Sequence, residues 1–296
     1  MRFLFVDKIL QLSPGELVRG IKHITADDTY LYQNNQGRFC FIPSLIGETL
    51  GQLAAWNVMY SNDFTLRPVA GIVASASLHR PAYVGETLLL ESFIESLDKE
   101  AVQYRSVATI DDEVVFTIDG ALGPLLPMED FIDRDLVRQQ FTQIYRPGEE
   151  LPQAFSQTMS GDSSSIAYLA PPMVFDHFFD IVPGVSMMAA KKITGSAAFF
   201  PDHFPKKPVL PMTVLLECKL NLARKFLSLA PWNETYLVSE LRKIKMNGFV
   251  FPGDVVVCQV KLKQKDSEQL ILSFRSEVDG KRVCVLDVVL NAKGIR

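Results

Sequence analysis

Two stretches of this chain are apolar on nearly every side of the helix that they predict. Residues 212–227 contain no proline or glycine and have apolar residues nearly all round the predicted helix. A helix that is apolar all round is normally buried. The sequence therefore predicts two buried helices, near residues 44–60 and 212–229. Each carries one glutamate, Glu48 or Glu217, in its second turn, where a carboxylate is costly unless it has a partner or a task.

Short segments rich in β-branched and apolar residues accompany each predicted helix. Turn signals such as Pro14-Gly15 and Asp279-Gly280 separate them, so they are expected to pair as antiparallel neighbours. One long buried helix with a run of such strands indicates an α+β fold, in which a curled antiparallel sheet wraps around the helix. The predicted strands cover residues 15–24, 68–80, 86–96, 101–111 and 113–122 in the first half of the chain, and residues 184–193, 236–246, 254–264, 269–278 and 282–292 in the second.

The two halves of the chain repeat each other. When the sequence is shifted by 169 positions, Pro14-Gly15 aligns with Pro183-Gly184, and Glu48 aligns with Glu217. These and further matches keep their order along both halves, which chance explains poorly. The pattern indicates two copies of one structural unit.

The repeat predicts two domains, at residues 1–127 and 170–296. The linker between them, residues 128–169, is expected to begin with a helix at 128–145. A polar segment rich in proline, glycine and serine follows, and its serines at 163–165 are interpreted as flexible linker rather than as nucleophiles.

Composition narrows the class of protein. The chain has 296 residues, of which 48% are hydrophobic and 22% charged, as expected for a globular protein. Its net charge of −4 argues against a nucleic-acid partner. Its four cysteines form no CxxC pair, so neither a metal site nor a disulfide framework is predicted, and a reducing compartment fits. With no signal-peptide pattern and no run long enough to span a membrane, the expected location is the cytoplasm.

The most distinctive motif lies in residues 199–221, "FFPDHFPKKPVLPMTVLLECKLN". The three prolines after His203 exclude a helix or a central strand, so they predict a stiff, extended segment that leads into the second buried helix. Glu217 follows His203 by 14 residues, on that helix.

This stretch resembles the signature of the hot-dog fold family of 3-hydroxyacyl-[acyl-carrier-protein] dehydratases, H-F-P-x-x-P-V-x-P-G-V-L-x-x-E. The opening "RFLFVDKILQLSPGELVRGIKHIT" and the segment "LHRPAYVGETLLLE" are also similar to that family. The resemblance covers almost the whole chain, twice, apart from the linker, and it implies a double hot-dog. The signature positions present are His203, Phe204, Pro205, Pro208, Val209, Pro211, Leu215 and Glu217.

Each copy departs from the family pattern. The first has Asn34 at the position of the histidine and has lost the His-Phe-Pro motif, although it keeps the helix glutamate, Glu48. In the second copy, Asp202 and Met212 replace two family glycines. Asp202 could orient the neighbouring histidine, raise its pKa or crowd the pocket.

In the family, each active site takes its histidine from one subunit and its acid from the other. The resemblance therefore implies two candidate sites in the fused pair, His203 with Glu48 and Asn34 with Glu217. The second lacks a base. We expect one working site, His203 with Glu48, and we interpret Glu217 as a second acid or a structural relic.

The implied chemistry suits these residue types. Dehydration of a 3-hydroxyacyl thioester needs a base for the C2 proton, and histidine titrates near neutral pH. It also needs an acid for the departing hydroxyl, and burial favours the protonated form of a carboxyl group. The thioester oxygen gains charge and calls for backbone N–H donors at a helix start. Met212 offers such a donor, whereas Pro43, at the aligned position, has none.

The resemblance also implies partners. The substrate would be a thioester of acyl carrier protein or of coenzyme A, which brings its own phosphopantetheine, so no cofactor or metal is expected. Basic side chains of the second copy are candidates for docking an acidic carrier, or form an ordinary solvated face. A homodimer of such chains is a further option. The candidate substrate contacts are Phe204, Pro211 and Gln52, and the candidate docking residues are Lys206, Lys207, Arg224 and Lys225.

The function implied is dehydration of 3-hydroxyacyl thioesters to trans-2-enoyl thioesters, in fatty-acid or polyketide synthesis. Two alternatives stay open. The losses in the first copy fit a non-catalytic scaffold that binds an acyl chain or a carrier protein. A hot-dog acyl thioesterase would instead need a carboxylate that activates water, and no histidine in an intact His-Phe-Pro motif.

Overall fold

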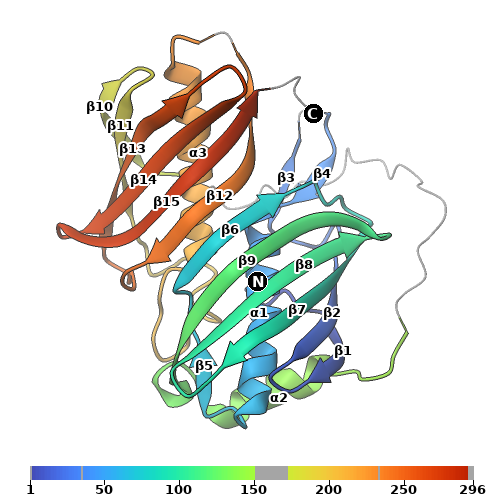
Figure 1. Ribbon diagram of the computed structural model, residues 1–296. Coiled ribbons are helices and arrows are strands. Elements are labelled where there is room, and N and C mark those ends of the chain that lie inside the picture. Colours follow the sequence, from blue (N-terminus) through green and yellow to red (C-terminus); the bar gives the residue numbers. More distant parts are fainter. Residues whose placement is uncertain (1, 35, 151–172, 233, 293–296) are drawn as a thin grey trace.

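The computed structural model describes residues 2–34, 36–150, 173–232 and 234–292. It consists of two halves, each a curved antiparallel sheet around one long helix (Figure 1). This confirms the predicted α+β double hot-dog. The first half contains β1 (Lys8–Ser13), β2 (Leu17–His23), β3 (Leu31–Gln33), β4 (Phe39–Phe41), α1 (Pro43–Ser61), β5 (Leu66–Pro68), β6 (Ile72–Leu78), β7 (Thr87–Leu97), β8 (Ala101–Ile110) and β9 (Glu113–Pro127). The second contains β10 (His177–Val182), β11 (Ser186–Lys192), α3 (Met212–Leu229), β12 (Tyr236–Met246), β13 (Val255–Lys265), β14 (Gln269–Val278) and β15 (Lys281–Ala292).

The sheets of the two halves are continuous. Strands of the described chain follow the order β1-β2-β7-β8-β9-β6-β12-β15-β14-β13-β11-β10, and β5 adds to the edge of β9. The halves join where β6 pairs antiparallel with β12, with Ala76 opposite Leu241. The two helices also touch. The concave sides of the two halves therefore lie next to each other. Residues of one copy can thus reach a site in the other.

The two central helices are buried, as their apolar pattern predicts. α3 has the predicted bounds, and α1 differs from its prediction by one residue at each end. No helix in the described ranges is both long and apolar enough to cross a membrane.

The region between the halves differs from its prediction. In place of one helix at 128–145, a 3-10 turn (Met128–Asp130) is followed by α2 (Arg134–Ile144). The side chains explain the break, because Phe131 and Ile132 leave the helical path and are buried in the core. The predicted polar linker segment spans 146–165, and its part from 151 onward, including the serines at 163–165, lies outside the described residues.

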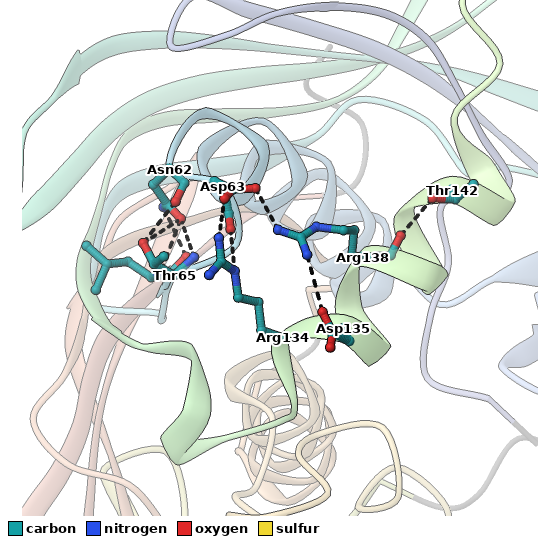
Figure 2. A network of polar contacts seen from close by, with 8 residues as sticks. Asn62, Asp63, Thr65, Arg134, Asp135, Arg138 and Thr142 are labelled. Carbon is teal, nitrogen blue, oxygen red and sulfur yellow. Dashed lines mark hydrogen bonds and ion pairs between the residues drawn. The ribbon is translucent and has the colours of Figure 1, made fainter.

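A polar network fastens α2 to the end of α1 (Figure 2). Both arginines of the first two turns of α2, Arg134 and Arg138, bind the Asp63 carboxylate, and the Arg138 Nη2 contact is 2.7 Å. Asp63 adopts a φ of 55°, and Asn62 stabilises this turn by accepting the Thr65 N–H at 2.9 Å. α2 is thereby held across the end of the first half, where it forms part of the wall of the cavity described below.

Lys219 is an unusual feature of the second core. It lies on α3 and is fully buried, and its ammonium group donates to the Cys284 thiol at 2.9 Å. Within the described part of the chain, no carboxylate pairs with it. A charge buried without a counter-charge lowers stability.

Replacing Lys219 by methionine is expected to raise the free energy of unfolding by about 1 to 4 kcal/mol, because methionine fills a similar volume without a charge. Urea unfolding measures the change. Lys225→Met is the matched control, since Lys225 is exposed on the same helix. A lower unfolding midpoint for Lys219→Met than for the control would contradict the expectation.

Candidate active site

A cavity of about 420 Å³ lies where the two halves meet. The first half contributes α1, β5, β6, β8 and β9 to its wall, and the second contributes the His-Phe-Pro segment and the start of α3. Several residues predicted from the sequence line it together, namely Glu48, Gln52, Asp202, His203, Phe204 and Met212.

The space beside α1 depends on missing side chains. Gly47 and Gly51 both line the cavity, and a Cβ atom at Gly51 would lie 3.7 Å from the Tyr104 hydroxyl. The repeat places Leu216 and Leu220 at the corresponding positions of α3, where both are buried. In the first copy, which lacks the signature histidine, glycines therefore leave space beside α1. In the second copy, which has His203, leucine side chains occupy the corresponding face of α3.

His203 is held by its backbone surroundings. Its Nδ1 lies 2.8 Å from the Val209 carbonyl oxygen, which can only accept, so Nδ1 carries the hydrogen and Nε2 is the free basic nitrogen. The Phe204 ring stacks on the imidazole, with ring centres 4.1 Å apart. Desolvation lowers the pKa of His203, and the charge of Glu48 opposes this shift. The imidazole is therefore neutral at pH 7.

Glu48 is oriented by two hydrogen bonds that come from different copies. Gln52, one turn further along α1, donates to its Oε1 at 3.1 Å. Thr213, the second residue of α3, donates to its Oε2 at 2.7 Å. Gln52 also binds the carbonyl of Phe3 at 3.0 Å, which ties the N-terminal segment to the site. The carboxylate of the first copy is thus held at the start of the helix of the second.

The start of α3 also borders the cavity. Met212 lines it. The first N–H groups of a helix have no partner inside the helix, and no side chain caps this end of α3. The corresponding first residue of α1 is Pro43, which lacks an N–H. Pro211 was expected to contact substrate, but it does not line the cavity. Instead it is the buried N-cap of α3, where its fixed φ sets the helix entry.

Asp202 binds the N-terminal segment of the chain. Its Oδ2 accepts the Phe3 N–H at 2.7 Å, and its Oδ1 lies 3.6 Å from Arg2. Asp202 was a candidate for orienting His203. In the structure the Val209 carbonyl takes that role instead.

No hydrogen bond joins the second predicted pair, Asn34 and Glu217, in the described part of the chain. The Asn34 side-chain oxygen accepts the N–H groups of Gln36 and Arg38 within the β3–β4 turn, a hairpin that the sequence did not predict. Glu217 is buried outside the cavity, 3.3 Å from Arg224, and its Oε2 has no hydrogen-bond partner in the described structure.

The candidate docking residues are partly engaged within the chain. Lys206 pairs with Glu129 at 3.0 Å and also with Asp133. The Lys207 ammonium lies over the rings of Phe131 and Phe249, and Arg224 pairs with Glu217. Lys225 is exposed. Carrier docking by these four side chains stays a prediction.

Three residues near the predicted pair were missed by the sequence interpretation. Arg67 and Tyr104 line the cavity, and Thr213 binds Glu48. Burial raises the pKa of Tyr104 to about 12, and Glu48 adds to the shift. Only Arg67 left a signal in the sequence, as a lone charge in the otherwise apolar run "LRPVAG".

The sequence comparisons match part of this chain to dehydratases. A family model described as the ApeI-like dehydratase matches residues 182–286. The C-terminal half is also 27% identical over 130 residues to the 3-hydroxyacyl-[acyl-carrier-protein] dehydratase FabZ of Pseudoalteromonas translucida, a match that covers 43% of this chain and 87% of that protein. The resemblance to hot-dog dehydratases is thereby confirmed.

Solved structures share the fold over almost the whole chain. The dehydratase domain of PpsC from Mycobacterium tuberculosis superposes with a TM-score of 0.55, at 10% identity, over 97% of this chain and 98% of that domain. An acyl-ACP thioesterase from Bacteroides thetaiotaomicron gives a TM-score of 0.53, at 10% identity, over 92% of this chain and 97% of that protein. At these identities the likeness establishes the double hot-dog fold alone.

Proposed function

We propose that this chain is a 3-hydroxyacyl thioester dehydratase with one composite active site. The observation that carries the proposal is that His203 and Glu48, from different copies, line one cavity, where the charge of Glu48 acts on His203. The dehydratase match over residues 182–286 supports the same reaction class.

In the proposed reaction, Nε2 of His203 removes the proton from C2 of the acyl chain. Glu48 gives its proton to the C3 hydroxyl, the C3–O bond breaks, and a C2=C3 double bond forms with release of water. The Met212 N–H, at the start of α3, would bind the thioester oxygen as its charge grows. The elimination involves no net oxidation or reduction, so the proposed reaction calls for no cofactor beyond the thioester carrier itself.

The composition of the cavity supports an acyl substrate. The glycines of α1 leave a channel beside the helix, with apolar side chains of β6 and β9 around it. An acyl carrier protein is the carrier that we propose, because the related FabZ proteins are named for that substrate. Coenzyme A remains the alternative carrier.

The purified chain is expected to hydrate a trans-2-butenoyl thioester, the reverse reaction, which is followed by loss of ultraviolet absorbance. Acyl carrier protein and coenzyme A thioesters are compared at equal concentration, and a thiol reagent monitors hydrolysis in the same samples. Release of free thiol without hydration would identify a thioesterase. Binding of both thioesters without turnover would identify a scaffold.

A further inference from the structure

Arg67 is a charged residue in the wall of an otherwise largely apolar part of the cavity. It lies on β5, the short strand that follows α1 and pairs with β9 (Figure 1). Its guanidinium stacks on the Phe204 ring, with Cζ 3.6 Å from the ring centre. Stacking occupies one face of the guanidinium and leaves its N–H edge available for hydrogen bonds.

The other charged side chains of the cavity have partners. Glu48 accepts hydrogen bonds from Gln52 and Thr213, and Asp202 binds Arg2 and the Phe3 N–H. By contrast, among the described residues no acceptor bonds to the Arg67 side chain, and its Nε is buried without a partner. The Arg67 side chain is half-buried, and a buried N–H without an acceptor is costly, so this group in a cavity wall points to a ligand.

The charge on Arg67 persists at neutral pH. Burial lowers its pKa to about 9, and the nearby Glu48 carboxylate opposes this shift. Among the described residues no ion pair joins Arg67 to Glu48, whose carboxylate is held by Gln52 and Thr213 instead. A hydrocarbon chain would leave Arg67 unpaired, whereas a carboxylate matches the planar N–H edge with two hydrogen bonds.

We propose that Arg67 binds a carboxylate on the acyl chain of the substrate, so that the preferred substrates are thioesters of dicarboxylic acids. This inference rests on the proposed function. Arg67 acts electrostatically on both His203 and Glu48, so the carboxylate would lie only a few bonds beyond C3. The phosphate of a phosphopantetheine arm is excluded as the occupant, because that phosphate is far from the reacting carbons.

The experiment compares trans-2-hexenedioyl and trans-2-hexenoyl thioesters of pantetheine, which share chain length and carry no phosphate. The full chain is expected to have the higher kcat/KM for the diacid. In Arg67→Met, the ratio of the two kcat/KM values should fall by roughly 10- to 100-fold, the usual loss when a charge-assisted hydrogen-bonded pair is removed. Arg105→Met is the control, since Arg105 stacks on Phe93 in a similar way but does not line the cavity.

An unchanged ratio in Arg67→Met would overturn the proposal. That result includes an equal loss on both thioesters, which would mean that Arg67 acts only through the ring of Phe204. Arg67→Lys, which keeps the charge but not the planar edge, should retain part of the preference.

A binding measurement separates this proposal from the proposed function. Calorimetry compares the saturated hexanedioyl and hexanoyl thioesters of pantetheine, which can be neither hydrated nor dehydrated. Tighter binding of the diacid that Arg67→Met abolishes would support the carboxylate site even if no thioester is hydrated. Hydration of both enoyl thioesters with no diacid preference in rate or binding would leave the proposed function intact and overturn the carboxylate site.

Discussion

Replacing His203 by alanine is expected to lower kcat/KM for hydration of a trans-2-butenoyl thioester by roughly 10²- to 10⁴-fold, the contribution of one positioned proton transfer. Among the described residues, His203 is the one histidine that lines the cavity. Its Nδ1–H is committed to the Val209 carbonyl, so Nε2 is the nitrogen that exchanges a proton with C2. Loss of the ring removes that transfer and leaves the cavity otherwise open.

A second substitution separates chemistry from structure. His203→Asn can still donate to the Val209 carbonyl but offers no base, and asparagine is the residue that the first copy has at the aligned position, Asn34. It should therefore fold like the wild type and lose activity like the alanine variant. His79→Ala is the control, because His79 is exposed and contacts Thr117 on β9. Full activity in the folded His203→Asn variant would exclude the imidazole as the base.

The parts of the fold that follow from local pattern were predictable. The apolar run of α3 has no competing signal along its length, so its bounds match the prediction. The strands that follow each helix carry β-branched residues between clear turns, and they form where expected. Because the two halves repeat each other in sequence, the second half was expected to have the same architecture as the first.

The features that escaped prediction depend on contacts between distant parts of the chain. Thr213 binds Glu48 across 165 positions, through the packing of one helix start against another. Arg67 faces the cavity because β5 pairs with β9. The β3–β4 hairpin replaces the lost motif with a new pairing, in which Asn34 serves its own turn. The pattern of residue types along the chain does not show which distant residues will be in contact.

The two helix glutamates occupy aligned positions of the repeat but have different surroundings. The repeat aligns Glu48 with Glu217, on helices of similar length and burial. Their surroundings differ. Glu48 faces the cavity and is held by Gln52 and Thr213, whereas Glu217 lies outside it beside Arg224.

Glu48→Gln is expected to lower kcat/KM for hydration by roughly 10²- to 10⁴-fold, because the amide keeps the shape of the side chain but cannot exchange the proton of the hydroxyl. Glu217→Gln should leave kcat/KM close to the wild-type value, since no part of Glu217 reaches the cavity. Both variants are measured on the same thioester, with thermal unfolding as the check on folding. The reverse result, loss with Glu217→Gln and retention with Glu48→Gln, would place the acid in the same copy as His203 and overturn the composite site. Because Thr213 still contacts an amide at position 48, the packing of the two helix starts is retained, and a loss in Glu48→Gln then reports on the proton alone.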